Sequence, residues 1–365
     1  MTTVFPSEKL AVDVFIDRRR RQAVKVVSGL SLGTIGLALI SLGVGAVAIA
    51  PENVLRVITS AITGQSDILQ GRDALVILNI RLPRLLLGFM VGAALAVSGA
   101  LMQGLFRNPL ADPGLVGVSA GAGLAAAVMI VLGERYLSGF IGKLPFAALP
   151  LAAFLGGLIS TLLLYAIATR EGRTSISTML LAGVALGALA GAATGLLAYI
   201  SDDRQLRDLT FWSMGSLGGA TWTKVVAVAP IILPLLLAVP LLARGLNALA
   251  LGEAEAFHLG LPVQRIKGMA IVLVALAVGA SVAAAGVIGF VGIVVPHLLR
   301  LMIGPDHRLL LPLSGIAGGA LLIGADMIAR LAVAPAELPI GIITAAIGAP
   351  FFLWLLLRRA LGIET

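Results

Sequence analysis

The chain of 365 residues is 59% hydrophobic and only 12% charged, with a mean hydropathy of +1.06. Soluble domains carry roughly a quarter charged residues, so this composition excludes a soluble globular fold. The chain has no cysteine, which excludes disulfides, thiolate metal sites and cysteine catalysis. The net charge of +8 is then typical of cytoplasmic loops beside membrane lipid, not of nucleic-acid binding.

The first element along the chain is a basic segment, residues 1–25, which contains four consecutive arginines (18–21) and Lys25. The apolar run that follows, 26–50, is longer than the apolar core of a signal peptide. We therefore expect it to be retained as a first transmembrane helix whose N-terminus lies in the cytoplasm.

Ten apolar segments have about the length that a helix needs to cross a ~30 Å hydrocarbon core. They lie at 26–50, 84–106, 114–133, 146–169, 176–200, 224–243, 268–285, 288–303, 309–331 and 338–357. The seventh and eighth share one nearly charge-free run, which would be ~48 Å long as a single helix. Because basic residues flank both of its ends, we expect this run to cross twice and to turn within 283–292. The sequence thus predicts an all-α polytopic membrane protein.

The charge distribution orients this topology. It places 16 of the 26 Lys and Arg residues inside and 10 outside, with both termini, including the tail 360–365, in the cytoplasm. Arg81 and Arg84 then face outward, where basic residues are disfavoured. From topology alone, they either extend to lipid head groups or have a partner.

The sequence contains no G-x-x-x-x-G-K-[ST] motif and no evident catalytic constellation, so the chain is not expected to be an enzyme. Asp326 is the one clear acid within a span, and Arg330 follows four residues later on the same helix face. The two side chains can form an ion pair, but a single pair within the spans is weak evidence for a proton relay. Energy for uphill transport is therefore expected from another subunit.

The cytoplasmic loop 244–267 is long, amphipathic and of mixed charge. Asn247 is expected to cap a short helix there, and Gly260-Leu261-Pro262 to end one helix and begin another. This helix would either dock on a partner subunit or lie on the membrane surface, and the residues alone do not choose between the two.

One long stretch, IRLPRLLLGFMVGAALAVSGALMQGLFRNPLADPGLVGVSAGAG from Ile80 onward, closely resembles the signature region of the FecCD-type permeases. These are the membrane subunits of ABC importers for iron–siderophore complexes, heme and vitamin B12. Further similar stretches are LLAGVALGA (180–188), NALALGEAEAFHLGLPVQRIK (247–267), GVIGFVGIVVPHLLRLMIGPDHRLLLP (286–312) and GADMIARLAVAPAELPIGIITAAIGAPFFLWLL (324–356). The resemblance covers essentially the chain from about residue 70 to 359.

The resemblance implies a type II ABC importer permease fold of ten transmembrane helices, here within 26–359. It implies a homodimer in the bacterial inner membrane, with two ATPase subunits below and a periplasmic binding protein above. The ATPases would use ATP and Mg, and this chain would bind no cofactor and no metal itself.

The resemblance also implies roles for particular residues. Arginines on the outer side would receive acidic residues of the binding protein: Arg81, Arg84 and Arg330. Guanidinium suits this role because it stays charged and pairs bidentately with carboxylate. The inner gate would be formed by Asn108 and Leu110, with a second constriction at Ile176 and Ser177. The loop that couples to the ATPase would present Leu251, Gly252, Glu253, Glu255, Leu259 and Gly260.

The cargo is the least determined part of the prediction. Three segments look most like the corresponding sequences of heme permeases: FRNPLADPGL, RQLRDLTFWSMGSLGGATW and LGEAEAFHLG. Ferric siderophore and vitamin B12 are the alternative cargoes. A secondary transporter that works alone is a further alternative. His258, His297 and His307 all fall on or near the cytoplasmic side, so none is a natural axial ligand in an outward-facing cavity. A wide passage lined by glycine and alanine, which holds its cargo weakly, is expected instead.

Overall fold

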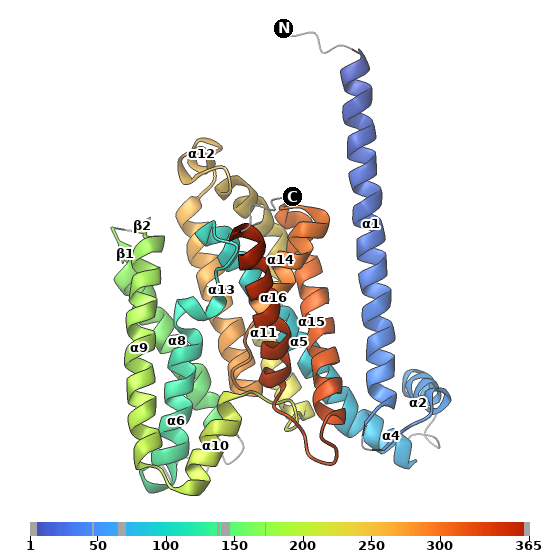
Figure 1. Ribbon diagram of the computed structural model, residues 1–365, viewed down its shortest axis with the longest axis vertical. Helices are drawn as coiled ribbons and strands as arrows, with labels where there is room; N and C mark the ends of the chain where they lie inside the picture. Colours follow the sequence, from blue (N-terminus) through green and yellow to red (C-terminus); the bar gives the residue numbers. More distant parts are fainter. Residues whose placement is uncertain are drawn as a thin grey trace.

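The computed structural model is a bundle of helices (Figure 1). It describes residues 6–45, 47–64, 71–136, 139, 147–171 and 173–360. The elements in chain order are α1 (Pro6–Gly43), α2 (Pro51–Thr63), α4 (Arg72–Val76), the π-helical turn η1 (Ile77–Arg81), α5 (Leu82–Phe106), the 3-10 turn η2 (Pro113–Val116), α6 (Val118–Tyr136), α8 (Ala148–Ala168), β1 (Thr169–Arg170), β2 (Arg173–Thr174), α9 (Ile176–Ile200), α10 (Asp203–Ser213), α11 (Trp222–Leu249), α12 (Glu253–His258), α13 (Val263–Ala285), α14 (Val291–Ile303), α15 (His307–Leu331) and α16 (Ile340–Ala360).

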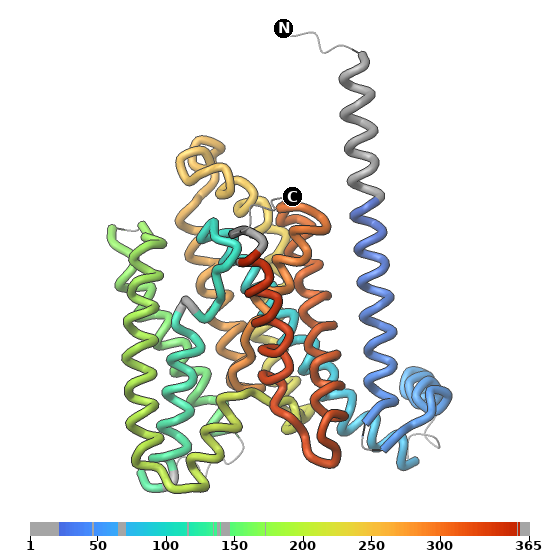
Figure 2. The backbone as a smooth tube through the Cα atoms, viewed as in Figure 1, coloured from blue at the N-terminus to red at the C-terminus, as the bar shows by residue number. Residues whose placement is uncertain are grey.

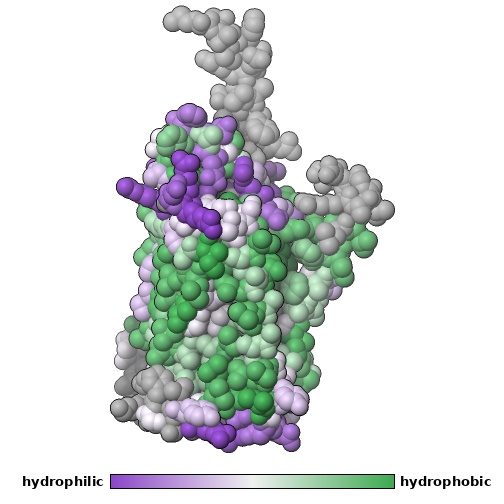
Figure 3. Space-filling view, turned by 90° about the vertical axis from the view of Figure 1, so that its left-hand side faces the viewer, coloured by the Kyte–Doolittle hydropathy of each residue, from purple (hydrophilic) through white to green (hydrophobic). Residues whose placement is uncertain are grey.

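The bundle has two distinct ends. The start of α1, the end of α16, the short helix α12 and the β1–β2 hairpin lie at one end, and α2, α4 and α10 lie at the other (Figures 1 and 2). A broad hydrophobic surface separates hydrophilic surfaces at the two ends (Figure 3). We name these the inner and outer ends, after the orientation that the positive-inside rule predicts.

The ten predicted spans are present. Seven helices of the described chain are long and apolar enough to cross a membrane, and the segments 118–133, 291–303 and 340–355 form shorter apolar helices. The first helix continues back through the basic segment to Pro6. The sequence did not predict α2 and α10, which fall in outer loops; α10 begins with a capping box between Asp202 and Gln205.

Helix α5 lies at the centre, where it packs against α11, α13, α14 and α15. Small residues allow this close packing. A Cβ atom on Gly99 would lie 1.9 Å from the carbonyl oxygen of Gly292, and one on Gly92 would lie 2.2 Å from that of Gly318. Glycine at these positions therefore sets the distance of α5 from α14 and α15.

The long apolar run after residue 267 is divided as predicted, into α13 and α14. The division differs from the prediction in one respect, because α14 begins at Val291 and not at 288. The start of α14 lies against Gly99, which is in the inner half of α5. The outer half of the eighth membrane crossing is therefore formed by residues 286–290, which are not helical. Gly286, with φ of 73°, begins this segment. Non-helical backbone at this depth is tolerated where protein covers it, as at Gly286 and Ile288, or where it lines a cavity, as at Val287.

Candidate functional site

Four charged residues form a cluster at the outer end, which we call the outer ion cluster: Arg84 on α5, Asp326 and Arg330 on α15, and Glu337 in the loop before α16. The Nε atom of Arg84 donates to Asp326 at 3.0 Å. Its Nη1 and Nη2 atoms donate to the two carboxylate oxygens of Glu337 at 2.8 and 3.0 Å. Arg330 Nε lies 3.1 Å from Asp326 Oδ2, so the pair predicted from the i,i+4 spacing is confirmed.

The two carboxylates of the outer ion cluster differ in exposure. The side chain of Asp326 is 6% exposed and that of Glu337 is 41% exposed. The hydrogen bond with the Arg84 guanidinium holds the pKa of Glu337 below its ordinary value, although partial burial opposes this. Arg84 therefore has one carboxylate partner in the protein interior and a second at the surface.

The remaining arginine contacts connect α1 to the bundle. Arg81 Nη1 donates to the carbonyl of Leu42 at 2.5 Å, and its Nη2 donates to the carbonyl of Val47. Arg330 Nη1 donates to the carbonyl of Val44 at 3.1 Å. Thus all three arginines that the sequence analysis singled out are engaged within the chain, and their docking to a binding protein stays a prediction.

At the inner end, α12 is the predicted short helix. The prediction that residues 260–262 separate two helices is confirmed, because α12 ends at His258 and α13 begins at Val263. The prediction that Asn247 caps a helix in this loop was wrong. Asn247 lies within α11, where its Oδ1 accepts from the backbone N–H of His307 and so helps to cap α15.

The surface of α12 is apolar where a partner could reach it. Leu251, Phe257 and Leu259 are each more than 60% exposed, whereas Ala256 is fully buried and anchors the helix. A role for Phe257 was not predictable from the sequence, since an aromatic residue in an amphipathic helix gives no sign of which way it faces. Glu255 lies on the exposed face and Glu253 is partly exposed.

Helix α12 is connected to the start of α9. Glu253 Oε1 accepts from Lys267 Nζ at 2.5 Å, and Lys267 lies in α13 with its side chain only 3% exposed. The same Nζ atom donates to the carbonyl of Thr174 at 3.4 Å, two residues before Ile176. The side chain of Lys267 thus connects the predicted coupling residue Glu253 to Thr174, next to the predicted constriction at Ile176 and Ser177.

The predicted gate turn follows α5. The Asn108 Oδ1 atom accepts from the backbone N–H of Leu110 at 3.0 Å, which closes a tight turn. Burial raises the pKa of Asp112, whose carboxylate accepts from the backbone N–H of Gly114 at 2.7 Å. In the described part of the chain, no hydrogen bond or ion pair connects this turn to Ile176 or Ser177.

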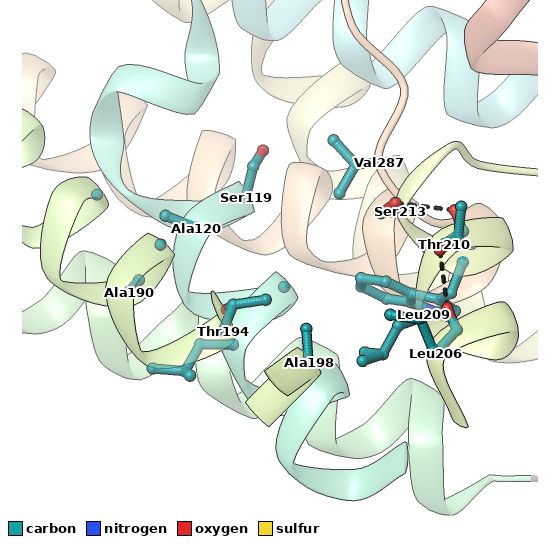
Figure 4. Close-up of a pocket in the computed structure, with 15 residues that line it drawn as sticks. Ser119, Ala120, Ala190, Thr194, Ala198, Leu206, Leu209, Thr210, Ser213 and Val287 are labelled. Carbon is teal, nitrogen blue, oxygen red and sulfur yellow. Dashed lines mark hydrogen bonds between the residues drawn. The ribbon is translucent and has the colours of Figure 1, made fainter. Parts of the chain in front are cut away.

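A cavity of about 430 Å³ lies between α6, α9 and α10 (Figure 4). Its lining is mostly small and weakly polar: Ser119, Ala120, Gly123, Leu124, Gly187, Ala190, Gly191, Thr194, Ala198, Leu206, Leu209, Thr210, Trp212, Ser213 and Val287. Ser119 and Ala120 come from α6, and Ala190, Thr194 and Ala198 from α9 (Figure 4). Such a lining can contact a large apolar molecule without holding it tightly.

The model of the FecCD transport family matches residues 33–358. The chain belongs to this family. It is 49% identical over 290 residues to the hemin transport system permease protein HmuU of Yersinia pestis, a match that covers 77% of this chain and 83% of that protein. It is 44% identical over 346 residues to the vitamin B12 import system permease protein BtuC of Salmonella typhi, covering 95% of this chain and 99% of that protein.

The fold agrees with the family. A solved structure described as an inward-facing conformation of a metal-chelate type ABC transporter superposes with a TM-score of 0.75 at 32% identity. The superposition covers 92% of this chain and 99% of the chain in that solved structure. As a member of the FecCD transport family, the protein is thus a multi-pass membrane permease, as its sequence predicts.

Proposed function

We propose that the protein is the transmembrane subunit of an ABC importer that moves heme from the periplasm to the cytoplasm by alternating access. The observation that carries this proposal is the 49% identity to a hemin transport permease. The importer would sit in a bacterial inner membrane with both termini of this chain in the cytoplasm. A homodimer of this chain, two ATPase subunits and a periplasmic binding protein would complete it.

The cavity between α6, α9 and α10 supports a flat, largely apolar cargo. Alanine, glycine and leucine supply much of its surface, and the indole of Trp212 is its one aromatic side chain. An aromatic ring can stack on a porphyrin, and the hydroxyl groups of serine and threonine bind weakly. Release is then feasible, because no strong ligand in this lining competes with the next site along the path.

Docking of the binding protein is proposed at the outer ion cluster. Both terminal nitrogens of Arg84 face Glu337, which is the more exposed of its two carboxylate partners. A carboxylate of the binding protein would therefore exchange with Glu337, while Asp326 keeps Arg84 in place. Arg81 and Arg330 would add positive potential that guides the encounter.

Coupling to the ATPase is proposed at α12. Exposed Leu251, Phe257 and Leu259 would enter a groove of the ATPase, and Glu255 would pair with basic residues at its rim. Movement of α12 would reach the start of α9 through Glu253 and Lys267. Closure of the ATPase pair would in this way open or close the passage.

The test is ATP-dependent uptake into proteoliposomes that contain this chain, its ATPase and the cognate binding protein. Heme, a ferric siderophore and cobalamin are offered in parallel, and an ATPase variant unable to hydrolyse ATP is the control. Uptake of heme alone is expected. Uptake of another cargo would refute the heme assignment, and ATP-independent uptake would refute the ABC mechanism.

Vitamin B12 is the second candidate cargo. The matches to vitamin B12 import permeases cover 95% of this chain, against 77% for the hemin permease. Their identity is lower, at 44% against 49%, which is why heme comes first. Cobalamin uptake in the same assay would decide for this alternative.

A further inference from the structure

Helix α1 is held to the bundle very differently at its two ends. At the outer end, Arg81 and Arg330 donate to carbonyls of Leu42 and Val44, and Arg330 also donates to the hydroxyl of Ser41 at 2.9 Å. At the inner end, a cavity of about 770 Å³ separates residues 22–28 of α1 from α14 and the start of α15. The protein leaves this space unfilled.

The cavity lies at the inner membrane boundary. Its lining on α1, within residues 22–28, includes the start of the apolar run that begins at residue 26. Its walls are apolar on both sides, with Val24 and Val27 on α1 facing Leu301, Met302, Ile303 and Leu309. Leu301 and Met302 are each 63% exposed. Water is a poor occupant for such walls, whereas a lipid acyl chain fits them.

The polar part of the lining carries a cation. Arg300 lines the cavity, and its guanidinium donates to Gln103 Oε1 at 2.5 Å. Among the described residues, no carboxylate forms an ion pair with Arg300. Asp306 on the rim is itself engaged, because it accepts from the backbone of Arg308 and from the side chain of Asn247.

Further basic residues lie close to the lining residues in the sequence of α1. Lys25 is exposed on α1, and the four arginines 18–21 directly precede the lining residues on the same helix. The inner leaflet of a membrane is rich in anionic lipid, which basic residues at its surface attract. Guanidinium in particular pairs with two phosphate oxygens at once.

We propose that this cavity is a binding site for an anionic phospholipid of the inner leaflet. The phosphate pairs with Arg300, and an acyl chain lies along the apolar walls between α1 and α14. Arg300 is hydrogen-bonded to Gln103, whose backbone carbonyl accepts from the N–H of Asn108 in the gate turn. The bound lipid therefore contacts the network that supports this turn, and it fills the space that α1 leaves at its inner end.

The test measures lipid binding to the purified full-length chain. After removal of lipid, the protein is titrated with phosphatidylglycerol or phosphatidylcholine, and bound lipids are counted by native mass spectrometry. Phosphatidylglycerol is expected to bind about fivefold more tightly, the effect of one surface cation on an anionic head group. Arg300→Gln should abolish this preference, and Arg308→Gln, which removes the same charge outside the lining, should preserve it.

A second pair of variants tests the place of the acyl chain. Met302→Trp fills the cavity and should lower the retention of both lipids, whereas Leu241→Trp, on an exposed position of α11 outside the lining, should not. Equal binding of the two lipids, an equal loss in both arginine variants, or unchanged retention in Met302→Trp would each overturn the proposal. Full competition by glycerol phosphate would also overturn it, since a soluble phosphate would then suffice.

Discussion

Replacing Asp326 by Asn should destabilise the protein far more than replacing Glu337 by Gln, although both carboxylates pair with Arg84. Asp326 is buried between two guanidinium groups, 2.9 Å from Arg84 Nη2 and 3.1 Å from Arg330 Nε. Asparagine keeps the shape of the side chain but removes its charge. Its amide NH2 group, a hydrogen-bond donor, would then face the N–H donors of an arginine. Removing one member of a buried ion pair costs about 3 to 5 kcal/mol.

We expect a loss of about 3 kcal/mol for Asp326→Asn, at the lower end of that range, because Glu337 still neutralises Arg84. Glu337 itself is 41% exposed, so solvent screens its pair with Arg84. Its replacement by Gln should cost about 1 kcal/mol or less. Both carboxylates pair with Arg84, so the difference follows from the burial of Asp326 and from its second partner, Arg330.

The assay is the thermal unfolding midpoint of the purified chain in one detergent, compared across variants. Glu52→Gln, which changes an exposed acid at the start of α2, is the control and should leave the midpoint unchanged. The midpoint shift for Asp326→Asn should be about three times that for Glu337→Gln or larger. Equal shifts would refute the reasoning, because burial would then not decide the strength of these pairs.

Four other predictions concern docking, pH dependence, coupling and packing. Glu337→Gln should strengthen binding of the substrate-binding protein several-fold at low salt, because it frees Arg84; calorimetry measures the affinity. Weaker binding would contradict the proposal that a carboxylate of the binding protein replaces Glu337 on Arg84. Since the pKa of Glu337 is lowered in the folded state, its pair stabilises the protein above the unfolded pKa of about 4.3. The stability difference between wild type and Glu337→Gln should therefore stay constant from pH 7 to 5 and vanish as pH falls through the folded pKa. Phe257→Ala should weaken co-purification of the ATPase at least tenfold, as for an interface hot spot, with unchanged folding of the permease. Gly99→Ala should prevent normal folding, judged by gel filtration, because its Cβ would overlap the start of α14, whereas Gly187→Ala, with open space around it, should be neutral.

The sequence was sufficient for the membrane-spanning segments. Apolar run length and flanking charge predicted the ten segments, including the division of the run after residue 267 into α13 and α14. The signals there are local, because a helix in lipid must satisfy its own backbone hydrogen bonds. The i,i+4 pair of Asp326 and Arg330 was predictable for the same reason.

The partners of the outer arginines were not predictable from the sequence. Arg84 and Glu337 are 253 residues apart, and nothing in either local sequence indicates the other. Asn247 was assigned to the wrong helix because its type matched a cap, whereas the N–H group that it satisfies lies 60 residues away. The link from Glu253 through Lys267 to Thr174 is likewise a product of packing between distant segments.

The carbonyl groups at the outer end of α1 have a consequence for biogenesis. The C-terminal end of a helix carries partial negative charge, and here two arginines neutralise it from other helices. The arginine that donates to Val44 lies 286 residues further along the chain. A ribosome therefore completes nearly the whole protein before the first helix acquires its last hydrogen-bond donor. A nascent chain that stops before the end of α15 leaves this end of the first helix with the hydrogen bonds of Arg81 but without those of Arg330.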